Sequence, residues 1–174
     1  MMENNDRVYL RALEPEDYKI SIEWRNDDEI WNMLGGRKYF VSSAYEKKWV
    51  EESIYNSKDV RLAVCLKQND LYIGNVYLTD IDNVNRSAIS HVLIGNKKYW
   101  GKGIALEATK QLLKFAFEEL GLHRITALIL QSNIGSLKMH EKCGYKEEGI
   151  LRDSIWKNGK FQNQVVMSIL DYEF

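Results

Sequence analysis

The segment with the clearest chemistry is a glycine-rich turn, Trp100-Gly101-Lys102-Gly103, which follows an apolar run and precedes an amphipathic stretch. A turn that joins a strand to the start of a helix points backbone N–H groups at an anion, and the helix dipole adds partial positive charge there. The side chains of Lys97, Lys98 and Lys102 add full charges. The segment therefore predicts a site for a phosphate-bearing molecule.

This turn fits neither of two common phosphate-binding motifs. A Rossmann fingerprint needs a third glycine three residues after Gly103, where Leu106 stands instead. A P-loop needs four residues between its glycines and then Lys-Ser/Thr, but more than four separate Gly95 from Gly101. A tight turn that binds no ligand is an equally good interpretation of the Gly-x-Gly pattern alone.

A second group of polar side chains lies between Asn133 and Tyr145. Asn133 stands where a helix N-cap is expected. The spacing i, i+3, i+7 places Asn133, Ser136 and His140 on one helix face, so they could line a cleft. The alternative is a short, capped surface helix. In either case three apolar residues are expected to face the core: Ile134, Leu137 and Met139.

Composition limits the class of protein. The chain has 174 residues, 45% apolar and 28% charged, which suits one globular domain over residues 1–174. A net charge of −1 argues against nucleic acid as a partner. Cys65 and Cys143 form no metal-ligand motif, so we expect no metal and a reducing cytoplasm. No apolar run approaches the ~20 residues that span a bilayer, so no membrane partner is expected.

The elements that position these groups follow from hydrophobic periodicity. We predict strands over residues 8–13, 61–67, 71–79, 87–94, 123–130, 145–155 and 162–170, one or two helices within 15–56, and helices over 103–120 and 133–143. Ser43 followed by Glu46 suggests a capping box. This order predicts a mixed α/β sheet of about seven strands, antiparallel early and parallel centrally, with about four helices.

Together the two polar segments resemble the GNAT superfamily of acetyl-CoA-dependent N-acetyltransferases, and the resemblance covers nearly the whole chain. The family's Gln/Arg-x-x-Gly-x-Gly/Ala motif is matched over residues 98–103, with Lys98 in place of Gln/Arg. The family's Asn-x-x-Ser/Ala motif is matched by Asn133 and Ser136, and its Lys-x-Gly-Phe/Tyr ending by residues 142–145. Residues 24–26 and 148–152 resemble a branch that acts on ribosomal-protein N-termini, spermidine and amino sugars.

The resemblance implies a GNAT-like fold in which two neighbouring parallel strands splay apart and hold the pantetheine arm of CoA. The strand before the turn would offer backbone groups to the pantetheine amides, as an added strand would. Amides of the turn would hold the pyrophosphate. The residues implied to contact acetyl-CoA are Val92, Leu93, Ile94, Lys98, Tyr99, Trp100, Gly101, Lys102, Gly103, Ile104, Ala105, Asn133 and Ser136.

The resemblance also suggests catalytic residues. Many relatives carry a tyrosine general acid where this chain has His140, which could donate a proton near neutral pH or be a surface histidine. Their strand glutamate is matched by Ile89, so that base is missing. His91 on the same strand face is a substitute candidate, with a half-buried structural histidine as the alternative. Positioning and a water chain without an essential side chain is a third possibility.

The sequence therefore predicts an enzyme that transfers an acetyl group from acetyl-CoA to a primary amine of a small molecule, a sugar or a peptide N-terminus. An acyl-CoA-binding module with little catalysis and an unrelated nucleotide-binding protein are the alternatives. The acids Asp27, Asp28 and Glu29 could favour a cationic acceptor or simply surround a helix end. Aromatic residues of the N-terminal helices could form an acceptor wall, core or homodimer contacts.

Overall fold

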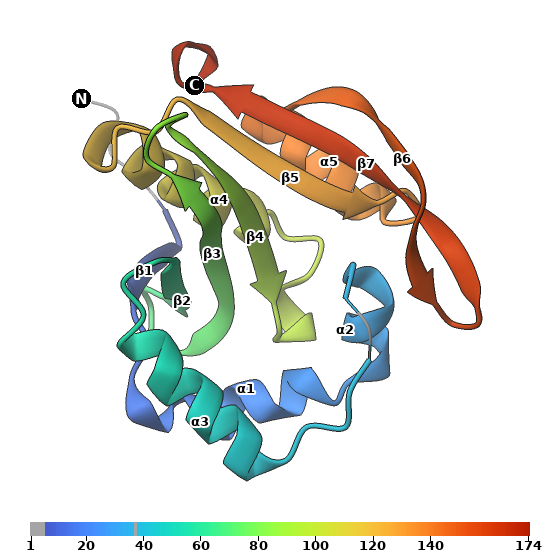
Figure 1. The fold of residues 1–174 in the computed structure, drawn as a ribbon. Coiled ribbons are helices and arrows are strands. Elements are labelled where there is room, and N and C mark those ends of the chain that lie inside the picture. Colours follow the sequence, from blue (N-terminus) through green and yellow to red (C-terminus); the bar gives the residue numbers. More distant parts are fainter. Residues whose placement is uncertain (1–5, 37) are drawn as a thin grey trace.

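A seven-stranded sheet in the order β1-β2-β3-β4-β5-β7-β6 forms the body of the computed structural model, which describes residues 6–36 and 38–174 (Figure 1). Neighbouring strands run antiparallel, except for the parallel pair β4 and β5. The strands are β1 (Val8–Ala12), β2 (Val60–Leu66), β3 (Tyr72–Asp82), β4 (Ser87–Ile94), β5 (Arg124–Leu130), β6 (Lys146–Lys157) and β7 (Lys160–Leu170).

Five α-helices occur in the described part of the chain. They are α1 (Tyr18–Arg25), α2 (Asp28–Met33), α3 (Ser43–Ile54), α4 (Ile104–Lys114) and α5 (Ile134–Cys143). In Figure 1, α1 and α3 lie together beside the β1–β4 half of the sheet, and α2 lies beyond the end of β4. None of the helices in residues 6–36 and 38–174 is long and apolar enough to cross a membrane.

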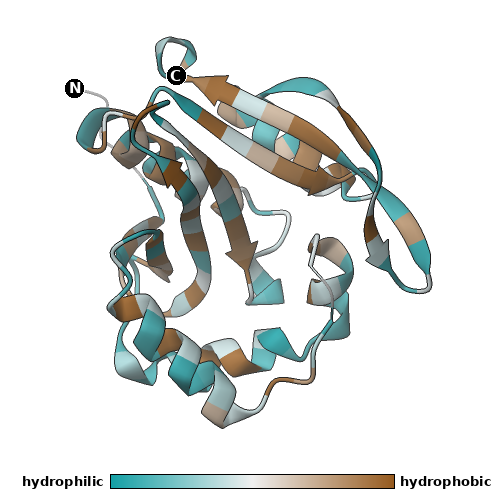
Figure 2. Cartoon of the chain, in the orientation of Figure 1, coloured by the Kyte–Doolittle hydropathy of each residue, from teal (hydrophilic) through white to brown (hydrophobic). Residues whose placement is uncertain are grey.

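Alternation along the strands builds a core on each face of the sheet. Val64 and Leu66 of β2 join the larger cluster with α4, whereas Ala63 and Cys65 join the smaller cluster with Trp24 of α1. This is the period-two pattern of a strand buried on both faces. Figure 2 shows a second contrast, between inner strands that are largely apolar and the edge strand β6, which is largely hydrophilic.

The parallel pair is short. β4 and β5 are paired only where Ser87, Ala88 and Ile89 meet residues 124–126. Beyond this point β4 and β5 diverge (Figure 1). The other edge of β5 pairs with β7 along the full length of β5. The edge of β4 that faces β5 therefore has no strand partner from residue 90 onward.

The predicted mixed α/β sheet is confirmed, but several local expectations were wrong. The N-terminal region holds three α-helices rather than one or two. The long helix ends at Lys114 and continues as a π-turn over Phe115–Glu119, where the amide of Leu120 bonds back to Phe115. Ser42, not Ser43, caps α3. Ile134 is 53% exposed and does not face the core.

Candidate functional site

The approach to the glycine turn is fixed by close packing at the end of β4. The amides of Gly95 and Asn96 both donate to the carbonyl of Ile73 on β3, at 2.9 and 3.1 Å. Position 95 needs glycine because a Cβ there would lie 1.9 Å from the Trp24 indole. Contacts with β3 and α1 therefore set the direction in which the chain leaves the strand.

A short 3-10 turn, η2 (Lys97–Tyr99), comes next and uses up some of the amides that the sequence assigned to phosphate. The amide of Tyr99 donates to the carbonyl of Asn96, and that of Trp100 donates to Lys97, at 3.0 and 3.1 Å. The Trp100 indole N–H also donates to the Ile94 carbonyl at 2.6 Å. Tyr99 and Trp100 therefore stabilise the loop. Of the amides predicted to contact phosphate, only those of residues 101–105 remain available.

Those later amides, of residues 101–105, are the candidates for holding an anion. Gly101 and Gly103 have φ angles of 70° and 79°, in the region that favours glycine. The first N–H groups of α4 have no acceptor within the helix. Within the described chain, the amides of residues 101–105 donate to no backbone carbonyl. A Cβ on Gly101 would meet no atom within 4 Å, so the turn has room beside it. These features fit a pyrophosphate group.

The three lysines near the turn are not equivalent. Lys97 lies 2.8 Å from Asp27 and 2.8 Å from Glu29 at the start of α2. These hydrogen bonds raise the pKa of Lys97 and lower the pKa of Asp27. Lys98 and Lys102 are exposed. The charge of Lys97 therefore ties the turn to α2, which leaves Lys98 and Lys102 as the cations for a phosphate.

Along β4, the side chains of the predicted pantetheine-binding segment are directed into the two cores. Val92 contacts the larger cluster, Leu93 contacts the smaller one, and Ile94 is 8% exposed. Only their backbone groups are left for a ligand on the β5 side. The prediction that an extended ligand binds there as an added strand does concerns these backbone groups.

Asn133 sits at the start of α5 and both ends of its amide are engaged. Its Oδ1 accepts from the Ser136 amide at 3.1 Å, which confirms the N-cap, and its Nδ2 donates to the Met33 carbonyl at 3.0 Å. Asn133 therefore connects α5 to the end of α2. Ser136 is half-buried, with its Oγ 3.4 Å from His140 Nδ1.

His140 lies in the interior and not on the exposed stripe that the spacing suggested. Its side chain is 4% exposed, and its Nδ1–H donates to the Ser136 carbonyl at 2.9 Å. The ring packs edge-on against Tyr145, whose hydroxyl lies 2.7 Å from the Ser90 hydroxyl on β4. Burial lowers the pKa of His140. A neutral, enclosed imidazole is poorly placed to protonate a thiolate directly.

His91 has the more useful environment. Its Nε2 lies 2.9 Å from the Thr79 hydroxyl, and that hydroxyl donates to Asp80 at 3.2 Å. When the Thr79 hydroxyl donates to Asp80, Nε2 carries the histidine proton and Nδ1 keeps its lone pair. Partial loss of water beside Tyr77 lowers the pKa of His91, with Arg61 acting in the same direction and Asp80 against it. The arrangement suits a neutral base.

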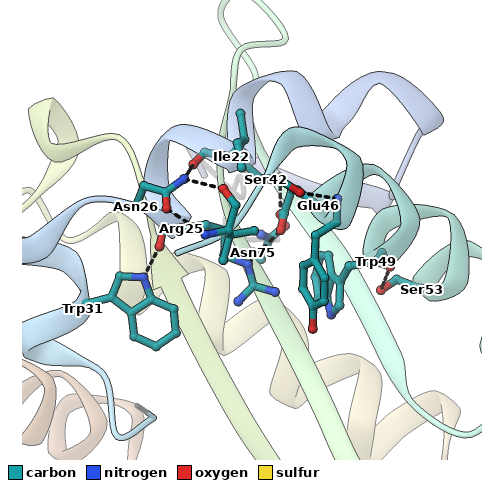
Figure 3. A network of polar contacts seen from close by, with 12 residues as sticks. Ile22, Arg25, Asn26, Trp31, Ser42, Glu46, Trp49, Ser53 and Asn75 are labelled. Carbon is teal, nitrogen blue, oxygen red and sulfur yellow. Dashed lines mark hydrogen bonds and ion pairs between the residues drawn. The ribbon is translucent and has the colours of Figure 1, made fainter. Parts of the chain in front are cut away.

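A buried ion pair on the same side of the sheet escaped the sequence analysis. Glu46 is fully buried, accepts from the Ser21 hydroxyl at 2.6 Å and from Arg25 Nε at 3.0 Å (Figure 3). The Arg25 guanidinium in turn lies 4.6 Å from the Trp49 ring. Glu46 therefore joins α1 to α3 instead of completing the predicted capping box. Its spacing from Arg25 is too long for any local motif to reveal the pair.

Asn26 and Trp31 complete this network. The Asn26 side chain exchanges two hydrogen bonds with the backbone of Val41, at 2.9 and 3.0 Å, and the Trp31 indole donates to the Arg25 carbonyl (Figure 3). These contacts fix the segment that leads from α2 to α3. Of the aromatic residues in this N-terminal region, Phe40 and Tyr45 are largely exposed.

A cavity of about 440 Å³ lies between α2 and the tip of the β6–β7 hairpin. Trp31 and Trp156 provide apolar walls, and Lys38 and Lys157 provide cations. Lys38 is paired with Asp28, whereas Lys157 is 6% exposed and donates to the Gly36 carbonyl at 3.1 Å. Burial lowers the pKa of Lys157. The cavity is therefore not an acidic one.

Comparison with known proteins decides the family. The model of the acetyltransferase (GNAT) domain matches residues 7–146. The chain belongs to the GNAT acetyltransferase family. The probable N-acetyltransferase YjcK of Bacillus subtilis is 31% identical over 173 residues, 94% of each chain. The spermidine N(1)-acetyltransferase of Vibrio cholerae is 30% identical over 175 residues, 98% of this chain and 96% of the relative.

Solved structures agree with this assignment. The structure of spermidine N-acetyltransferase from Vibrio cholerae in complex with CoA and spermine superposes with a TM-score of 0.89 at 28% identity, over 97% of this chain and 98% of the other. As a GNAT enzyme, the chain transfers an acetyl group from acetyl-CoA to an amine. No group of three or more side chains that could hold a metal ion occurs in residues 6–36 and 38–174.

Proposed function

We propose that acetyl-CoA lies along the unpaired edge of β4, with its pyrophosphate at the amides of residues 101–105, and that the acceptor amine approaches on the His91 face. One observation carries this proposal: the β4–β5 pairing stops at Ile89, on the strand that leads into a turn of unpaired amides. An extended donor satisfies backbone groups that the sheet itself leaves free. Lys98 and Lys102 add charge for the phosphates.

The acceptor must lose a proton before it attacks the thioester. A lysine-like alkyl amine has a pKa near ~10.4 and is mostly protonated at neutral pH. We assign this proton to Nδ1 of His91, taken directly or through water, while Thr79 and Asp80 hold the ring by its other nitrogen. A backbone N–H in the Val92–Ile94 stretch is the donor for the oxyanion.

His140 takes a supporting role in this proposal. Its ring fills the space between α5 and Tyr145, and its Nδ1–H caps the Ser136 carbonyl. It therefore holds the first turn of α5, which carries Asn133 and Ser136 beside the donor. The leaving thiolate takes its proton from water, since the imidazole is buried.

The charges favour an acceptor that is not a polycation. The acids suggested for a cationic acceptor are bonded to lysines: Asp28 binds Lys38, and Asp27 and Glu29 share Lys97, which leaves that cluster one negative charge. The buried Lys157 adds a positive charge to the cavity beside α2. We therefore propose a primary amine on a neutral or anionic body, such as a peptide N-terminus, in the reducing cytoplasm that two buried free thiols suit.

An acetylation screen with the full chain tests this proposal. Thiol release and product mass are followed with spermidine, dipeptides of neutral and acidic sequence, and an amino sugar, each at one pH and salt concentration. We expect the dipeptides to exceed spermidine in kcat/KM by about tenfold or more, because like charge at Lys157 opposes a polycation. Higher kcat/KM for spermidine would refute the acceptor class, and no thiol release with any amine would refute the activity.

A further inference from the structure

Arg7, at the start of the chain's first strand, reaches across to the glycine turn, although it stands far from the turn in the sequence. Its Nη2 donates to the Lys102 carbonyl at 2.7 Å. Its Nε donates to Glu107 Oε1 at 2.8 Å, and its backbone amide donates to Glu107 Oε2 at 2.9 Å. One residue thus holds both the middle of the turn and the first part of α4.

The bond to Lys102 fixes the orientation of a peptide group. In a trans peptide the C=O and the following N–H point in opposite directions, and the described residues contain no cis peptide bond. When the Lys102 carbonyl is turned toward Arg7, the Gly103 N–H is turned away from it. Glycine at 103 has little intrinsic preference for this orientation, because φ is free at a residue without Cβ.

The bonds from Arg7 offset the negative charge of Glu107. Glu107 lies in the first part of α4, next to the amides proposed to hold pyrophosphate, where an unpaired carboxylate would repel a phosphate. The Arg7 guanidinium donates charge-assisted hydrogen bonds to Glu107 Oε1 from both Nε and Nη2, and the backbone amide of Arg7 donates to Oε2. The Glu107 side chain is 20% exposed, so its charge is less screened by water than that of a free surface acid.

We propose that Arg7 is a positioning residue for donor binding: it orients the Lys102–Gly103 peptide and neutralises Glu107, so that the turn accepts the pyrophosphate of acetyl-CoA. The inference rests on the proposed function and adds a residue outside both sequence motifs. Arg7 acts through the turn and not by contact with the thioester, so its effect falls on KM and not on kcat.

Donor analogues that lose their phosphates stepwise test this role. Acetyl-CoA, acetyl-dephospho-CoA and acetyl-pantetheine are compared as donors for the full chain and for Arg7→Gln. The variant should raise KM about tenfold for the first two donors, which both contain pyrophosphate, with kcat within about twofold. It should leave kcat/KM for acetyl-pantetheine unchanged, because that donor has no pyrophosphate.

A matched control comes from a second exposed arginine–glutamate pair. The Arg124 guanidinium donates to both carboxylate oxygens of Glu148. Arg124 is the first residue of β5 and pairs with Ser87, at the end of β4 opposite to the glycine turn. Arg124→Ala should leave KM for all three donors unchanged. Arg7→Lys keeps the charge but loses the second guanidinium donor to Glu107, which is Nε, so its KM should lie between those of the wild type and Arg7→Gln. Melting temperatures of all variants confirm that each is folded.

Three results would overturn the inference. An equal loss with acetyl-pantetheine would mean that Arg7 supports the fold in general. A loss confined to acetyl-CoA would mean that Arg7 binds the 3′-phosphate directly. A wild-type KM in Arg7→Gln would mean a mere surface ion pair. These outcomes differ from failure of the proposed function, in which the wild-type protein itself would release no thiol with any amine.

Discussion

The donor side and the acceptor side of this sheet are built in opposite ways. The proposed donor side is a turn in which the amides of residues 101–105 have no backbone partner within the described chain, with Gly101 and Gly103 at positive φ. On the acceptor side, the polar groups are already bonded to one another, as Glu46 is to Ser21 and Arg25. One region keeps its hydrogen-bonding capacity for a ligand, and the other uses it to hold helices together.

This difference says where binding and where rigidity come from. Free amides at a helix start cost little to leave in water, and they gain most when an anion replaces that water. A fully buried carboxylate must be paired, because an unpaired charge in the interior is expensive. Substitutions on the donor side should therefore affect ligand affinity, and substitutions in the Glu46 network should affect stability.

The sharpest way to break the comparison is Gly101→Glu. A negative side chain beside the amides, at a φ of 70°, should abolish the CoA-induced rise in melting temperature and raise KM for acetyl-CoA by about 100-fold or more. Gly121→Glu is the matched control, since Gly121 also has positive φ and no atom near a Cβ. An undiminished CoA shift in Gly101→Glu would remove the donor-site assignment.

Next in size is the effect of His91→Ala on turnover. Loss of the base should lower kcat by about 100-fold, and Thr79→Val, which frees the ring, by several-fold. Because the pKa of His91 is lowered from 6.5, the acid limb of the wild-type kcat/KM profile should lie below pH 6.5. That limb should vanish in His91→Ala. A variant with unchanged kcat and an unchanged limb would assign proton removal to water alone.

Glu46→Gln should act on stability and leave the donor site alone. Removing the charge leaves Arg25 without its buried partner and should lower the unfolding free energy by about 2 kcal/mol, less than a fully buried pair would lose, because the Arg25 side chain is 27% exposed. Urea denaturation measures this change, with the exposed Glu52→Gln on the same helix as control. A raised KM for acetyl-CoA at normal stability would contradict the division of roles.

The smallest expected effect concerns His140 and acid. The native pKa of His140 is lowered, so the unfolded chain binds that proton more readily, and stability is lost as pH falls below 6.5. The loss is at most about 1.4 kcal/mol per pH unit for one group. Urea denaturation at pH 7.5 and 5.5 should show a smaller difference in His140→Gln than in the wild type.

How far the sequence predicts the molecule follows the same division. The glycine turn and the Asn133 cap are local patterns, so the sequence placed both on the right elements, and the β4 boundaries were predicted residue for residue. The mixed order of strands and helices was enough for the sheet. These features depend on neighbours within a few residues, which spacing can reveal.

The remaining features depend on residues that meet only after folding. Glu46 was predicted to complete a capping box, since the sequence does not show that its partners, Ser21 and Arg25, lie on another helix. His140 was expected to line a cleft or lie at the surface, because helical spacing gives a shared face but not what covers it, and here Tyr145 packs against the ring. Arg7 carried no signal at all, since Glu107 is one hundred positions away. No local pattern encodes such pairs.

The short pairing of β4 with β5 also bears on aggregation. A continuous sheet has two edges, which here are β1 and β6, but the split gives this sheet two more, on β4 and β5. Unpaired strand edges invite strands from other chains. Because β4 and β5 come together at Ile89, the gap between these inner edges suits a thin extended ligand better than a strand of another chain. A donor bound along β4 would therefore also prevent strands of other chains from pairing with this edge.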